Sequence, residues 1–179
     1  MLKRFTNLFL LIPALAVTGL SQSVHADWDV NNGGISVEDA RDVVITLKSD
    51  PNHDPEAACL AVTFARSLAR NPNANITLFV TLDGVNLASD KYISKRRLKE
   101  YECSTPFPFD PPHVTLKENL DTFITDTIGD HHNVVVCPIC WKERYGEEIP
   151  DYGVLPGVDG VPGDAIGKMM FDADKILDF

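Results

Sequence analysis

Residues 131–146 read His-His-Asn-Val-Val-Val-Cys-Pro-Ile-Cys-Trp-Lys-Glu-Arg-Tyr-Gly and decide the fold. The β-branched run Val134–Val136 predicts a strand that is buried on both faces, as in a parallel sheet. Pro138 ends this strand and suits the first turn of a helix, which Gly146 then terminates. We therefore expect Cys137 at the carboxyl end of a strand and at a helix N-terminus, where the helix dipole lowers the pKa of a thiol.

The N-terminus predicts export. Residues 1–26 contain Lys3 and Arg4, then an apolar run from Leu8 to Val17, and they end in a Val-His-Ala sequence at Ala26. A basic start, an apolar run too short to span a bilayer comfortably and a small-residue ending are typical of a secretory signal peptide. A retained membrane anchor is the alternative. Cleavage after Ala26 would leave one soluble domain of 153 residues, periplasmic or secreted.

The charge of the chain argues against two classes of partner. The net charge is −10, and loss of Lys3 and Arg4 with the signal peptide takes it to −12. Such a surface repels phosphate backbones and anionic lipids, so we expect no nucleic acid partner and no membrane surface after cleavage. The sequence also shows no phosphate loop, Ser-His-Asp order or paired carboxylates, which leaves kinase and hydrolase interpretations without support.

Strand and helix signals alternate along the rest of the chain. Strands are predicted at 42–47, 75–82, 134–136 and 173–179, and helices behind an N-cap at Asp54, behind a capping box at Thr115 and over 164–171. Residues 27–41 are expected to form an N-terminal arm and residues 42–179 a single domain, with a proline-rich insertion loop at 103–113 and a further loop at 152–163. The pattern predicts an α/β fold: a mainly parallel sheet of about five strands with helices on both faces, in a Rossmann-like three-layer arrangement. No Gly-x-Gly-x-x-Gly follows the first strand, so the nucleotide-binding fingerprint is missing.

Four cysteines, Cys59, Cys103, Cys137 and Cys140, all follow the predicted signal peptide. An oxidising compartment favours disulfides, and the three possible pairings remain open. The Cys137–Cys140 spacing fits a thiol–disulfide redox pair, a structural disulfide or half of a zinc site with the neighbouring histidines. No second ligand pair has matching spacing, so we expect no metal and no cofactor.

Other candidate residues lie at the same edge of the predicted sheet. His53 follows the first strand, and Asp83 and Gly84 follow the second, so parallel strands would bring them near Cys137. Together with Pro138, these residues are our predicted substrate-binding set. Each also has a structural interpretation: a solvated turn histidine, a turn of the Asp-Gly type and a helix-initiating proline.

Four motifs in order resemble the DsrE/DsrF-like family of small α/β domains. They are Ala57–Ala65, Leu78–Ala88 with its Asp-Gly-Val, Val134–Cys140 and the closing Ala173–Phe179. The resemblance implies a sheet flanked by helices, a homo-oligomer and, as in the sulfur-relay members, a cysteine that carries sulfur as a persulfide.

The sulfur-carrying cysteine of that family matches Cys137 by its place at the end of a strand. The resemblance thus implies a sulfurtransferase-like sulfur carrier with Cys137 and Cys140 as its catalytic residues. Its partner would be a sulfur donor or acceptor protein or a small thiol. Thiol–disulfide exchange and a non-catalytic metal-binding or partner-binding module are the alternatives.

Overall fold

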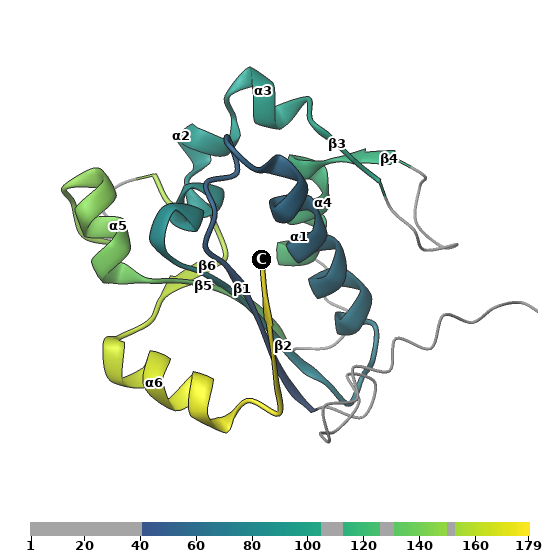
Figure 1. Ribbon diagram of the computed structural model, residues 1–179, viewed down its shortest axis with the longest axis vertical. Helices are drawn as coiled ribbons and strands as arrows, with labels where there is room; N and C mark the ends of the chain where they lie inside the picture. The colour runs from purple at the N-terminus through teal and green to yellow at the C-terminus, as the bar shows by residue number, and fades with distance from the viewer. Residues whose placement is uncertain (1–40, 105–112, 126–130, 150–152) are drawn as a thin grey trace, which may run out of the picture.

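A five-stranded parallel sheet runs through the centre of the fold (Figure 1). The computed structural model describes residues 41–104, 113–125, 131–149 and 153–179. The strands lie in the order β6-β5-β2-β1-β7, and every neighbouring pair is parallel. Their bounds are β1 (Asp42–Leu47), β2 (Asn75–Val80), β5 (His132–Val136), β6 (Val158–Gly160) and β7 (Lys175–Asp178). The predicted α/β class is confirmed, and the closing strand lies at a sheet edge as expected.

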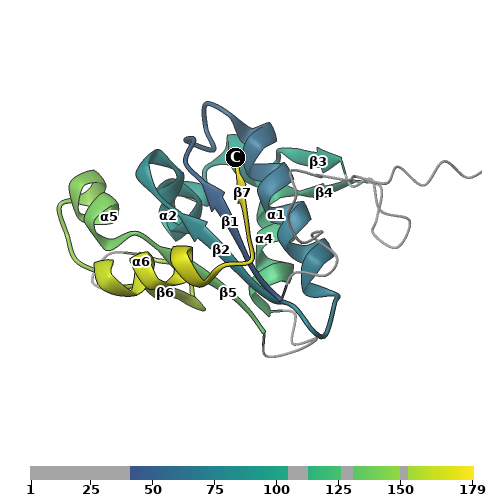
Figure 2. The ribbon, with the colours of Figure 1, turned by 60° about the horizontal axis from the view of Figure 1, so that its bottom comes forward.

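Helices cover both faces of this sheet, as Figures 1 and 2 show from two directions. Helices α1 (Pro55–Ala69) and α4 (Leu116–Thr125) pack on one face, and α6 (Gly163–Asp172) lies on the other. Within β1, Ile45 and Leu47 belong to the main core, whereas Val44 belongs to the smaller cluster under α6. Because successive residues of a strand face opposite sides, a strand covered on both faces must be apolar throughout. This constraint explains the unbroken apolar runs in the sequence.

The sequence signals for two helices are confirmed by their caps. The Asp54 carboxylate accepts a hydrogen bond from the Ala57 N–H at 3.0 Å, with Pro55 as the first residue of α1. Helix α5 (Pro138–Tyr145) begins with proline and ends at Gly146, which has a φ of 75°. Glycine adopts this left-handed conformation without the steric cost that a side chain imposes.

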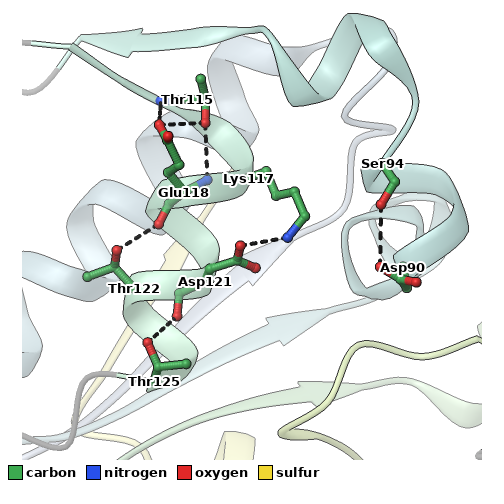
Figure 3. Close-up of polar contacts among 8 residues, drawn as sticks. All are labelled: Asp90, Ser94, Thr115, Lys117, Glu118, Asp121, Thr122 and Thr125. Atoms are coloured by element: carbon green, nitrogen blue, oxygen red, sulfur yellow. Dashed lines mark hydrogen bonds and ion pairs between the residues drawn. The ribbon is translucent and has the colours of Figure 1, made fainter.

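Helix α4 begins with the predicted capping box, drawn in Figure 3. The Glu118 N–H donates to the Thr115 hydroxyl oxygen at 3.2 Å, and the Thr115 N–H donates to the Glu118 carboxylate at 3.0 Å. These hydrogen bonds from Thr115 lower the pKa of the Glu118 carboxyl below its ordinary value. The box satisfies backbone donors that the first turn of a helix leaves without partners.

The predicted insertion loop at 103–113 is wrong at its two ends. Strands β3 (Glu102–Ser104) and β4 (His113–Thr115) pair there in antiparallel fashion, with Cys103 opposite Val114. Residues 105–112 between them lie outside the described residues. A disulfide joins Cys103 to Cys59 of α1, and both residues are buried. The prolines of the sequence between the two strands disfavour strand structure. Burial of Cys103 and its covalent link to α1 favour the β3–β4 pairing despite these prolines.

Two further boundaries differ from the prediction. Strand β2 ends at Val80 rather than at Leu82, and a 3₁₀ helix, η1 (Leu82–Ala88), follows it. The predicted loop at 152–163 contains β6, whose Val158 pairs with Val134 and is buried. A free sheet edge next to β5 offers backbone hydrogen bonds and burial that outweigh the weak strand propensity of this glycine-rich segment.

The basic segment at 91–99 forms two one-turn helices, α2 (Asp90–Ile93) and α3 (Arg96–Lys99). The predicted signal peptide and all but the last residue of the predicted arm lie outside the described residues. Within the described ranges, no helix is both long enough and apolar enough to cross a bilayer.

We predict that the double substitution Cys59→Ala and Cys103→Ala lowers the free energy of unfolding by about 4 kcal/mol. The reason is that the disulfide closes a 44-residue separation, and the unfolded chain regains that conformational freedom when it is lost. Chemical denaturation followed by circular dichroism measures the change. Cys137→Ser with Cys140→Ser is the matched control and should keep most of the stability. An equal loss in both double variants would contradict the structural role of the Cys59–Cys103 bond.

Candidate thiol site

The Cys137–Cys140 pair lies at the carboxyl edge of the sheet because β2 and β5 are in parallel register. Val80 is opposite Val136, and the N–H of Cys137 continues the pairing with a 3.0 Å hydrogen bond to the Val80 carbonyl. Cys137 is also the N-cap of α5, and its sulfur accepts a hydrogen bond from the Cys140 N–H at 3.4 Å. The two Sγ atoms are 2.7 Å apart. The motif therefore forms a dithiol site within one helical turn.

The two thiols differ in accessibility. Cys137 is only 8% exposed and belongs to the cluster under α6 with Val44, Phe79 and Val135. Cys140 lines a surface pocket together with four neighbours: Leu82, Asp83, Glu143 and Arg144. Cys137 is not among the lining residues, so a reagent that enters this pocket meets Cys140 before Cys137.

The chain after β2 supplies polar partners to Cys140. The Thr81 hydroxyl lies 3.4 Å from the Cys140 sulfur, and the Leu82 backbone N–H also forms a hydrogen bond to it. Leu82 has a φ of 50°, which a leucine rarely adopts, and its side chain is 60% exposed. Such backbone strain persists only where the surroundings enforce it, and it is concentrated at functional sites.

These contacts lower the pKa of Cys140 and not that of Cys137, which is the reverse of what the sequence led us to expect. Burial raises the pKa of the Cys137 thiol, and its hydrogen bond with Cys140 raises it further. Burial is also the largest single influence on Cys140, but hydrogen bonds from Cys137, Thr81 and the Leu82 N–H together lower the pKa of that thiol. The expectation of a lowered pKa at Cys137 is therefore wrong. The helix N-terminus is present, but desolvation of the strand-end position outweighs it.

A charged network forms one wall of the pocket. The Arg144 guanidinium lies 3.2 Å from the Asp83 carboxylate through Nη1 and 3.2 Å from the Asp50 carboxylate through Nη2. Burial raises the pKa of Asp50, but hydrogen bonds from the Asn52 N–H and the Tyr92 hydroxyl, together with Arg144, lower it overall. Arg144 is thus held between two carboxylates from the ends of β1 and β2.

The other predicted site residues take different positions. Asp83 lines the pocket beside Cys140, and Pro138 begins α5 without lining the pocket. Gly84 is buried under the site: a Cβ there would lie 2.1 Å from the Leu47 carbonyl oxygen. His53 is exposed in the turn after β1, where its N–H donates to the Asp50 carbonyl, and it does not line the pocket. The sheet edge therefore brings Asp83 to the cysteines, whereas His53 stays apart from them.

Sequence reasoning missed Thr81, Leu82, Asp50 and Arg144. Arg144 had a signal, because it follows Cys140 by four residues and so shares its face of α5. Leu82 had none, since leucine does not favour the positive φ that it adopts here.

The proposed half of a zinc site finds no further ligands. In the part of the chain that the structure describes, no group of three or more His, Cys, Asp or Glu side chains could hold a metal ion. His132 instead packs its ring against Phe123, with the centroids 5.0 Å apart.

We predict that Gly84→Ala lowers the free energy of unfolding by about 3 kcal/mol or more, because the added Cβ forces the η1 turn away from β1. Thermal or chemical denaturation measures the loss. The matched control is Gly167→Ala in α6, where a Cβ meets nothing within 4 Å. That change should raise the stability by about 0.5–1 kcal/mol. A harmless Gly84→Ala would show that η1 does not need this close approach.

We predict that Cys140 is alkylated by iodoacetamide faster than Cys137 and at lower pH. Thr81→Val should shift the alkylation profile of Cys140 to higher pH and slow its reaction several-fold near neutrality, because a hydrogen bond to the thiolate is lost. Peptide mass spectrometry after timed alkylation gives the rate at each cysteine. Ser94→Ala, which removes a hydroxyl from the end of α2, serves as control. First labelling at Cys137 would overturn this order.

The sequence matches no protein-family model and no curated protein. Among solved structures, the chain is similar to the YchN protein of E. coli, with a TM-score of 0.50 and 18% sequence identity. The similarity covers 78% of this chain and 99% of the YchN chain. YchN has the DsrE/DsrF-like fold. At this level of identity the comparison concerns the fold alone: the described chain shares the α/β fold of YchN.

Proposed function

We propose that this chain binds and relays sulfane sulfur as a persulfide on Cys140, with Cys137 as the resolving thiol. The observation that carries the proposal is the position of the Cys140 sulfur. It lines the pocket, and it has hydrogen bonds to Thr81 and to the Leu82 N–H. The DsrE-like fold, which includes sulfur-relay proteins, supports the same chemistry.

The first step is a transfer between sulfur atoms that needs no outside oxidant. The Cys140 thiolate attacks the terminal sulfur of a donor persulfide, R–S–SH, forming Cys140–S–SH and releasing the donor as R–S⁻. The lowered pKa of Cys140 increases the fraction of this thiol that is in the attacking thiolate form. Transfer onward to an acceptor thiolate is the reverse of this step with a different partner.

The second thiol provides an exit when no acceptor arrives. Cys137 attacks the Cys140 sulfur, and Cys140–S–SH and Cys137–SH become a Cys137–Cys140 disulfide and H₂S. The 2.7 Å separation of the sulfurs favours this step, and the raised pKa of Cys137 slows it by keeping that thiol protonated. A persulfide on Cys140 would thus have time to meet an acceptor.

Export and self-association remain proposals made from the sequence. The Lys3-Arg4 start and the apolar run at 8–17 support a signal peptide, and with it a sulfur donor or acceptor outside the cytoplasm. A homo-oligomer is proposed from the family resemblance.

The proposal predicts that polysulfide adds one sulfur atom to the peptide that holds Cys140. The purified protein is first treated with a mild reductant that opens the accessible pair; it is then exposed to polysulfide, alkylated and analysed by peptide mass spectrometry. Cys137→Ser should retain the added sulfur longer than the unaltered protein, because the resolving thiol is lost. Cys140→Ser should gain none. Sulfur on Cys137 in the unaltered protein would overturn the assignment, and no gain on either cysteine would overturn the carrier function.

Thiol–disulfide exchange is the second candidate, and the 2.7 Å distance between the sulfurs favours it. A redox pair should have a reduction potential in the range of known exchange proteins, about −270 to −120 mV. A potential below about −300 mV would instead identify a structural disulfide. Equilibration with defined glutathione mixtures, followed by alkylation of the free thiols, measures this potential.

A further inference from the structure

We propose that the pocket around Cys140 selects sulfur donors that carry positive charge and rejects anionic ones. The inference rests on the proposed function in one respect only, namely that Cys140 is the reactive thiol. It goes further because it names the charge class of the substrate.

The charged side chains that line the pocket are mostly acidic. Of the five lining residues, Asp83 and Glu143 are acidic and Arg144 is the one basic residue. Arg144 is held by the carboxylates of Asp83 and Asp50, each at 3.2 Å. Asp50 is 9% exposed and remains charged. The charged lining residues are thus two carboxylates and one guanidinium, and that guanidinium is also paired with Asp50, so the pocket has a net negative charge.

Arg144 is already paired with two carboxylates, which offset its attraction for an anionic substrate. A carboxylate, sulfonate or thiosulfate bound by Arg144 would also lie beside the negative charge of Asp83. The next basic residue on α5, Lys142, is paired with Glu148 and does not line the pocket. The negative charge of Glu143 also acts on Cys140 and raises the pKa of this thiol.

The pocket also has an exposed apolar lining residue, Leu82. Leu82 is 60% exposed and Ile139 is 65% exposed, although both are large and apolar. Leu82 lines the pocket, whereas Ile139 does not. A cationic donor with apolar neighbours, such as a cysteine on a basic protein segment, complements the exposed Leu82 side chain; a small aminothiol offers the charge alone.

The test measures how fast Cys140 forms mixed disulfides with three probes: cystamine, which is cationic, bis(2-hydroxyethyl) disulfide, which is neutral, and dithiodipropionate, which is anionic. In each case the Cys140 thiolate attacks one sulfur of the probe and releases the other as a thiolate. The Cys137→Ser variant is used so that the mixed disulfide accumulates. Each rate is divided by the rate of the same probe with a small uncharged thiol, which removes differences between leaving groups.

We expect the corrected rate to fall from cystamine through the neutral probe to dithiodipropionate, by about tenfold or more in total. Added salt should reduce this ratio. Glu143→Gln should also reduce it, whereas Glu102→Gln, which makes the same change in net charge on β3, should leave it unchanged (Figure 1). Equal rates for all probes, faster reaction of the anionic probe or an equal effect of both variants would overturn the proposal.

A peptide arm separates the two sources of cationic donor. A disulfide-linked peptide with lysines and an apolar residue beside its cysteine is compared with cystamine on the Leu82→Asn variant, since asparagine tolerates the positive φ of this position. Slower reaction of the peptide alone identifies a basic protein segment as the donor. Unchanged rates for both identify a small aminothiol.

The outcomes also separate this inference from the proposed function. Charge preference without any stable persulfide on Cys140 would refute sulfur relay and retain the selectivity. A persulfide that forms on Cys140 without any charge preference among the probes would retain sulfur relay and refute the selectivity.

Discussion

The hydrogen bond from the Cys137 N–H to the Val80 carbonyl, 3.0 Å long, is the interaction on which the site depends. It extends the parallel ladder of β2 and β5 one residue beyond the strands and so fixes where both strands end. Thr81 and Leu82 leave β2 at that level, and α5 leaves β5 there. The polar groups of one strand end thus reach the sulfur on the helix that follows the other. Parallel pairing is what makes this possible, because it brings consecutive carboxyl ends to one edge.

The fold could be predicted from the sequence wherever burial imposes a pattern. Val134–Val136 had to be apolar on both sides because α4 and α6 cover opposite faces of the sheet, and the same holds for Val43–Ile45. Caps were equally readable, since Asp54, Thr115 and Gly146 each act through their own backbone or side chain. Strand β6 was not readable, because three residues pair there on account of a neighbouring edge rather than their own propensity. Its formation is a tertiary effect.

The site was predictable in its location and not in its electrostatics. The Cys-Pro-Ile-Cys motif gave the two sulfurs and the helix that begins between them. The sequence did not indicate that Val44, Phe79 and Val135 would desolvate Cys137 from the α6 side of the sheet. Nor did it indicate that Thr81 and a strained Leu82 would supply partners to Cys140. The division of roles between the thiols comes from residues far apart in the chain, and such contacts have no local signature.

The positions of the four cysteines have a consequence for biosynthesis. Cys59 and Cys103 belong to the core on the α1 side, whereas Cys137 belongs to the cluster under α6. Once the fold has formed, the buried Cys59–Cys103 disulfide offers no free thiol to Cys137 or Cys140, so oxidative mispairing is confined to the unfolded chain. There the short Cys137–Cys140 loop closes faster than the 44-residue Cys59–Cys103 loop. The Cys137–Cys140 pair would be oxidised first and so kept out of scrambled isomers. It could be reduced again after the buried Cys59–Cys103 disulfide has closed.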